Sequence, residues 1–209
     1  MSNETSYLIG RTDEPLYSKT IPTLFQETVS KHGNKNAAIF SSQNIKLTYE
    51  ELKLEIDRLA YGLVSLGLLK GDRVGIWSPN RYEWLLTQFA TARIGLILVN
   101  INPAYRLSEL EYALNKVQCK AIISAESFKT SNYIEMLKEL APELKDCNAG
   151  HLKAERLPHL RHVISMGDGN ESGLFTFSQI LKFGTSVKTS DLDVITNKLN
   201  PNDPINIQF

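Results

Sequence analysis

A repeated unit, a short apolar run followed by a helical pattern, occupies the middle of this 209-residue chain. The apolar runs 74–77, 96–99 and 121–124 have the length of buried strands and are too short for helices. Between them, over 81–94 and 108–117, apolar residues recur every three or four positions, as on one face of a helix. Because the connecting links are short, the strands are expected to run parallel with right-handed crossovers. The pattern predicts an α/β fold with a mostly parallel sheet flanked by helices.

Capping residues and glycines predict where the helices begin and end. Thr48 and Glu51 have the spacing of a capping box, in which two side chains satisfy free N–H groups of the first turn. A glycine follows the last apolar residue of a helical pattern at Gly33, Gly67 and Gly95. Further helix starts are predicted at Thr23 with Gln26, Asn80 with Glu83, and Ser108 with Glu111. The side chains expected on the sheet side of 81–94 are Trp84, Leu85, Phe89 and Ala92.

The regions around this central repeat show weaker patterns. The short runs 37–40 and 45–47, separated by four polar residues, predict a β-hairpin. Residues 141–160 have the composition of a polar connection. Further elements are predicted as helices over 128–140, 175–183 and 191–199, and as strands over 163–165 and 205–209. The chain is therefore divided into an extended lead-in, 1–22, and an α/β scaffold, 23–209.

The composition excludes several classes of protein. Lys+Arg and Asp+Glu number 23 each, so no overall field attracts the chain to nucleic acid. No apolar run approaches the roughly 20 residues of a membrane-spanning helix. The two cysteines, Cys119 and Cys147, are too few for a disulfide framework, and this favours a reducing compartment.

Motifs for phosphate, metal or nucleophilic chemistry are weak in this sequence. No Gly-x4-Gly-Lys-Ser/Thr loop occurs, and Gly167-x-Gly169 lacks the third glycine of a dinucleotide site, so a turn is favoured there. His151, His159 and His162 alternate with arginines and are interpreted as a solvated basic loop. Cys119 is interpreted as a small buried residue, although Lys120 beside it could lower the thiol pKa. Trp77, Tyr82, Trp84 and Phe89 are assigned to apolar faces, and Asp57, Glu109 and Glu111 to solvent faces of helices.

The carboxyl ends of the three central strands form the one position where a ligand is expected. In open parallel sheets, ligands bind beyond these ends. The residues there are small and polar: SPN at 78–80, NINP at 100–103 and SAE at 124–126. Two interpretations stay open. These residues either contact a ligand or serve only as caps and turn formers, roles in which Ser and Asn are common. The second interpretation, caps and turns, is favoured.

Four blocks in order then resemble one family, the AMP-forming acyl-CoA synthetases of the adenylate-forming superfamily. They are LTYEEL at 47–52, KGDRVGIWSPN at 70–80 with Glu83-Trp84 following, NINPAY at 100–105 leading into ELEYAL at 109–114, and NPNDPINIQF at 200–209. The likeness covers about residues 20–209. Within the family, the chain is most similar to medium-chain fatty acyl-CoA synthetases of the mitochondrial matrix type.

The resemblance implies an ATP-dependent acid–thiol ligase. A carboxylate and ATP would give an acyl-adenylate and pyrophosphate, and CoA would then displace AMP. The expected ligands of the full-length parent are a medium-chain fatty acid, ATP with Mg²⁺, and CoA. The expected location is the mitochondrial matrix, with the cytoplasm as the alternative.

The resemblance also implies that this chain is an N-terminal portion of such an enzyme. The family's phosphate loop would follow Phe209, so the resemblance assigns no catalytic, cofactor-binding or metal-binding residue to residues 1–209. The portion is expected to be inactive alone. The alternative is a short product that acts as a binding partner or decoy for the full-length enzyme.

Overall fold

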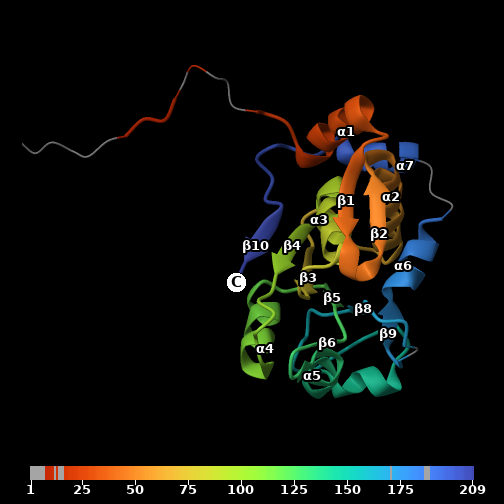
Figure 1. Cartoon of the computed structure of the whole chain (residues 1–209). Coiled ribbons are helices and arrows are strands. Elements are labelled where there is room, and N and C mark those ends of the chain that lie inside the picture. Colours follow the sequence, from red (N-terminus) through yellow and green to blue (C-terminus); the bar gives the residue numbers. More distant parts are fainter. Residues whose placement is uncertain (1–7, 12, 14–16, 170, 186–188) are drawn as a thin grey trace, which may run out of the picture.

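Six strands form the central sheet of the computed structural model, which describes residues 8–11, 13, 17–169, 171–185 and 189–209 (Figure 1). The remaining residues of the predicted lead-in lie outside this description. Every neighbouring pair of strands is parallel. In spatial order the strands are β10 (Asn206–Gln208), β4 (Ile97–Asn100), β3 (Arg73–Trp77), β5 (Ala121–Ser124), β8 (His162–Ser165) and β9 (Leu174–Thr176). The predicted parallel α/β fold is confirmed.

Helices cover both faces of this sheet. On one face, α2 (Tyr49–Ser65) and α3 (Tyr82–Ile94) pack together, and α1 (Ile21–His32), α6 (Phe177–Phe183) and α7 (Thr189–Thr196) pack against them (Figure 1). On the other face lie α4 (Leu107–Lys116) and α5 (Tyr133–Leu140) (Figure 1). The central strands β3 and β5 are buried almost throughout, because apolar side chains from both helical layers cover them. No helix among the described residues is both long and apolar enough to cross a bilayer.

The predicted hairpin is confirmed as β1 (Asn36–Phe40) and β2 (Ile45–Thr48), which pair antiparallel. A 3-10 turn, η1 (Ser41–Gln43), and Asn44 with a φ of 53° connect the two strands. Asparagine tolerates this left-handed conformation better than most residues. The hairpin packs on α2, outside the main sheet.

The observed helix starts agree with the predicted caps at α2 but not at α1. The capping box of Thr48 and Glu51 is confirmed at the start of α2. The start at Thr23 is wrong: α1 begins at Ile21, and Thr20 is the cap, with its side chain accepting the Thr23 N–H. Pro22 lies in the first turn, where its missing N–H costs nothing, so the helix can begin before Thr23.

Two further predicted starts are also wrong, because groups other than the predicted caps satisfy the first N–H groups. Helix α3 begins after Arg81, not Asn80, and Gln43 of the hairpin turn accepts the Tyr82 N–H at 2.7 Å. Helix α4 begins after Arg106, whose N–H donates to the Glu109 carboxylate at 3.1 Å, and Ser108 is not the cap.

Helix α3 also turns a different face to the sheet than the sequence predicts. Leu86, Ala90 and Ile94 are buried. Of the four predicted inner residues, Ala92 is buried as expected, but Trp84, Leu85 and Phe89 are only half-buried. The reason is that α3 carries apolar side chains around most of its circumference, so spacing alone does not identify the inner face.

Three later elements differ from the prediction. The helix expected over 128–140 is shorter, because a small hairpin, β6 (Ser127–Phe128) and β7 (Ser131–Asn132), precedes α5. The connection expected over 141–160 contains a 3-10 helix, η2 (Pro142–Asp146), and buries several leucines. The helix expected over 175–183 begins only after strand β9. In all three segments the apolar residues are spaced irregularly, so neither a helical nor a strand period identifies the elements.

Gly62 determines how closely α2 and α6 approach. A Cβ at position 62 would lie 2.2 Å from the Ile180 carbonyl oxygen, so the two helices would have to separate. Alanine would gain about 1 kcal/mol of helix propensity at an open position. The overpacking is expected to outweigh this gain, and Gly62→Ala should lower the free energy of unfolding by about 2 kcal/mol. Urea denaturation measures the change.

The control is Gly169→Ala, where the nearest atom is 3.8 Å from the new Cβ. A Gly62→Ala variant as stable as that control would contradict the prediction.

Candidate functional site

The structure brings the three predicted polar segments together at one edge of the sheet. Strands β4, β3 and β5 are neighbours and run parallel, so their carboxyl ends point the same way (Figure 1). In register, Ile76 lies beside Asn100, and Trp77 lies beside Ser124. Segments 78–80, 100–103 and 124–126 therefore follow one another along this edge, which is the candidate site.

Two stacked, buried aromatic residues hold the backbone of the candidate site in place. Trp77 and Tyr133 are fully buried, and their rings stack with centroids 3.6 Å apart and planes 16° from parallel. The Trp77 indole N–H donates to the Asn102 carbonyl at 3.1 Å, and the Tyr133 hydroxyl donates to the Pro103 carbonyl at 2.5 Å. Burial raises the pKa of Tyr133 to about 12, so the phenol stays protonated and keeps donating at neutral pH. The two rings thus hold the backbone at the carboxyl end of β4 through two side-chain donors.

The polar side chains of the edge mostly bond to their own backbone. Ser78 donates to the Pro79 carbonyl and Ser124 to the Ala125 carbonyl, both at 2.8 Å. The Asn102 side chain accepts the Ala104 N–H at 2.9 Å. These are the local bonds of turn-forming residues. Among the described residues, the buried Asn100 Oδ1 accepts no hydrogen bond.

The edge does not by itself fit ATP or Mg²⁺. The polar groups along 78–80, 100–103 and 124–126 are neutral apart from Glu126. Within the described parts of the chain, no three His, Cys, Asp or Glu side chains gather in a way that could hold a metal ion. Triphosphate binding needs cations or aligned N–H donors, so we assign none of these residues to ATP, Mg²⁺ or CoA.

The three histidines occupy different environments. His151 and His159 are exposed, whereas His162 lies half-buried in β8. Burial, with Arg161 and His151 nearby, lowers the pKa of His162. The prediction of a solvated basic loop therefore fits His151 and His159 but not His162.

Cys119 is a buried thiol with no sign of activation. Burial raises its pKa to about 12, which leaves almost no thiolate at neutral pH. Lys120, the possible activator, instead pairs with Asp72 at 2.7 Å.

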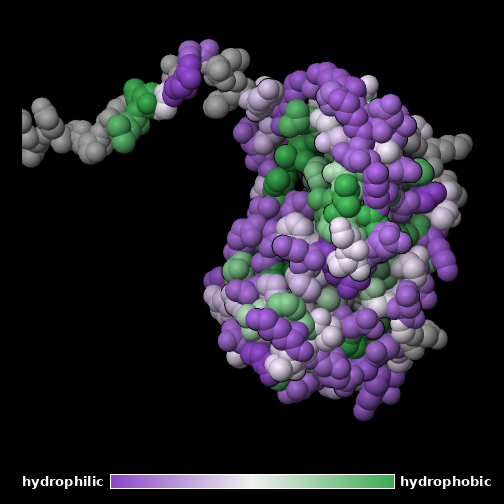
Figure 2. All heavy atoms as spheres, in the orientation of Figure 1, coloured by the Kyte–Doolittle hydropathy of each residue, from purple (hydrophilic) through white to green (hydrophobic). Residues whose placement is uncertain are grey.

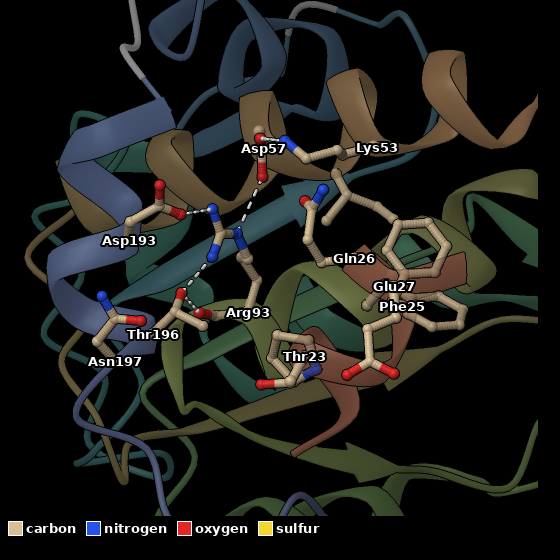
Figure 3. A pocket seen from close by; sticks show the side chains of 13 residues that line it. Thr23, Phe25, Gln26, Glu27, Lys53, Asp57, Arg93, Asp193, Thr196 and Asn197 are labelled. Carbon is tan, nitrogen blue, oxygen red and sulfur yellow. Dashed lines mark hydrogen bonds and ion pairs between the residues drawn. The ribbon is translucent and has the colours of Figure 1, made fainter. Parts of the chain in front are cut away.

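A second polar cluster, which the sequence did not reveal, lies between three helices. Asp57 was assigned to a solvent face, and this was wrong, because its side chain is only 4% exposed. It accepts from Lys53 at 2.6 Å and from Arg93 of α3 at 3.0 Å. Arg93 also binds Asp193 of α7 at 2.6 Å and donates to Thr196 (Figure 3). Helices α2, α3 and α7 are thereby joined through one guanidinium group.

This cluster lines a pocket of about 260 Å³ next to α1 (Figure 3). Lys53, Asp57, Arg93 and Asp193 carry two positive and two negative charges and pair among themselves. The charges therefore have partners without a ligand, and the cluster is a link between helices. One local signal marks it in the sequence: Arg93 interrupts the apolar pattern of α3.

Solved structures identify the class of this fold. A coronafacic acid ligase of Pectobacterium brasiliense, in its R395G mutant form, superposes with a TM-score of 0.69 over 91% of this chain and 33% of its own, at 18% identity. The anthranilate CoA ligase AuaEII, in complex with anthranoyl-AMP, gives 0.66 over 82% of this chain and 29% of its own, at 20% identity. The fold is that of the N-terminal domains of adenylate-forming ligases.

The family follows from the sequence itself. The model of the AMP-binding enzyme family matches residues 25–209, so the chain belongs to that family. The mitochondrial medium-chain acyl-CoA ligase ACSF2 of Danio rerio is 42% identical over 205 residues, which are 98% of this chain and 34% of that protein. A putative acyl-CoA synthetase of Bacillus subtilis, YngI, is 34% identical over 93% of this chain and 35% of its own. The chain spans about a third of the length of the curated relatives it matches, and the resemblance found in the sequence is confirmed.

Proposed function

We propose that this chain supplies the N-terminal α/β scaffold of an ATP-dependent fatty acid–CoA ligase. The single observation that carries the proposal is the family match over 25–209, together with medium-chain acyl-CoA ligases at 42% identity. The proposed reaction has two balanced steps. A fatty acid carboxylate attacks the α-phosphate of ATP and pyrophosphate leaves; the CoA thiol then attacks the acyl carbon and AMP leaves. The full-length protein would use Mg²⁺ with ATP.

The scaffold's part in this reaction is to hold the edge of the sheet on which the substrates assemble. Support comes from the three neighbouring strand ends and from the Trp77–Tyr133 pair, which holds the segment after β4. In open parallel sheets this edge is the usual ligand position.

The 209-residue chain alone is proposed to be inactive. The motivating observation is that the described residues of the edge carry no cation or metal cluster for the triphosphate. Purified chain should show no ATP–pyrophosphate exchange that depends on octanoate, while the Danio rerio ligase, assayed in parallel, should show it. Exchange by the 209-residue chain above the no-enzyme background would refute the proposal.

The mitochondrial matrix is the proposed location, because the relatives at 42–44% identity are named as mitochondrial. Cell fractionation of the tagged natural protein tests it. Recovery with cytosolic rather than matrix markers would favour the alternative.

A second function is favoured by one observation, the open edge of β10. Among the described residues, this strand pairs only with β4, so the N–H and C=O groups on its other side can accept another strand. The chain could therefore act as a binding partner or decoy for the full-length enzyme. Size-exclusion chromatography and a pull-down with full-length ligase test this, and a monomer without affinity argues against it.

A further inference from the structure

Helix α3 carries more apolar surface than the described fold covers. Its Leu86, Ala90 and Ile94 are buried, while Leu85 and Phe89 on other sides are only half-buried. A helix that is apolar around its circumference is normally enclosed by protein. Phe25 of α1 packs on Phe89 with ring centroids 4.9 Å apart, so α1 covers part of this surface.

The uncovered part forms an apolar groove of about 600 Å³. The residues that line it come from α1, β1, α2, α3 and the start of β10, and Figure 2 shows hydrophobic surface gathered between α1 and β10. On the α1 side, Ile21 is 39% and Leu24 is 42% exposed. Val29, 8% exposed, is the one residue of α1 that is buried.

The groove is continuous with the open edge of the sheet. Ile205, just before β10, and Asn206, its first residue, line the groove, and within the part of the chain that the structure describes β10 pairs with β4 alone. A strand edge with unpaired backbone groups beside an apolar groove suits a polypeptide better than a small ligand, because both backbone and side-chain contacts are offered.

We propose that this groove is the docking surface for the two thirds of a ligase chain that the present chain does not match. The inference rests on the proposed function. The occupant is argued from length: relatives that match 98% of this chain are about three times as long. The docking segment presents apolar side chains to Leu24, Phe25 and Phe89, and completes the enclosure of α3.

The test uses the unmatched two thirds of the Danio rerio ligase, produced as a separate polypeptide. Its binding to the 209-residue chain is measured by surface plasmon resonance. Leu24→Asp places a charge in the groove and should weaken binding more than tenfold, because a carboxylate would be buried without a partner. The matched control is Leu69→Asp, a leucine 67% exposed and outside the groove, which should change binding less than twofold.

A fusion protein tests the same contact without requiring two separate polypeptides to bind each other. The 209-residue chain is fused to the same polypeptide, and the melting temperature is measured for both substitutions. Leu24→Asp should lower it more in the fused chain than in the 209-residue chain, where Leu24 is already partly in water. Equal shifts in both, or wild-type binding by Leu24→Asp, would overturn the inference. A dimer of the 209-residue chain that Leu24→Asp dissociates would also overturn it, because a second copy would then cover the groove.

An activity assay distinguishes failure of the proposed function from failure of the docking proposal. Octanoyl-CoA formation from octanoate, ATP and CoA is assayed in the same mixture and fused chain. Docking without product would contradict the function and leave the docking surface standing. Product formation that Leu24→Asp does not affect, with unchanged binding, would contradict the docking surface alone.

Discussion

Replacing Arg93 by methionine is expected to lower the free energy of unfolding by about 3 kcal/mol. The Arg93 side chain is 12% exposed, and its loss leaves Asp57, 4% exposed, with Lys53 as its remaining partner. Removing one member of a buried ion pair is costly, because the other charge stays out of water. The same change also frees α7, since Arg93 holds Asp193 and Thr196. Urea denaturation followed by circular dichroism measures the difference.

Two comparisons isolate the buried charge as the cause. Arg156→Met removes an arginine that binds Glu111 through two nitrogens at the surface, and it should cost less than about 1 kcal/mol. Adding Asp57→Leu to Arg93→Met should recover more than half of the loss, because the uncompensated carboxylate is then gone. If Arg93→Met cost no more than Arg156→Met, the described cluster would not link the helices.

Trp77→Ala is expected to have the largest effect of any single substitution considered, about 4 kcal/mol. The indole is fully buried in the central strand of the sheet and stacks on Tyr133. Alanine would leave a large cavity, remove the stacking and take the donor from the Asn102 carbonyl. Thermal unfolding measures the loss, and near-ultraviolet circular dichroism reports the changed environment of Tyr133.

A second tryptophan provides the matched control. Trp84 lies on α3 and is only half-buried, so Trp84→Ala should cost less than half as much. Trp77→Phe keeps a ring in the stack but loses the N–H, and about 1–2 kcal/mol is expected. A Trp84→Ala loss equal to that of Trp77→Ala would show that the stacked pair is not a special support of the candidate site.

Much of the fold could be predicted where local rules and tertiary packing agree. The strands of the central repeat, the hairpin and the Thr48–Glu51 capping box all rest on residues within a few positions of one another. The approximate place of the candidate site also followed, because parallel strands bring their carboxyl ends to one edge. Position along the chain and strand direction were enough for that prediction.

Two predictions failed because the deciding partner is distant in sequence. Gln43 replaces Asn80 as the group that receives the first N–H of α3, and the two are brought together only because the hairpin packs beside that helix. Asp57 was assigned to a solvent face of its helix. Its actual neighbours, Arg93 and the helix that carries Asp193, come from 36 and more positions away.

The sequence by itself therefore determined the α/β class, the parallel strands, the family and the edge at which a ligand is expected. These depend on period, turn residues and ordered motifs, which are local properties of the chain. The tertiary structure decided which face of α3 meets the sheet, which charges are buried in pairs, and where apolar surface stays open beside β10. Such features depend on what lies across from a residue in space, and a one-dimensional pattern carries no information about that.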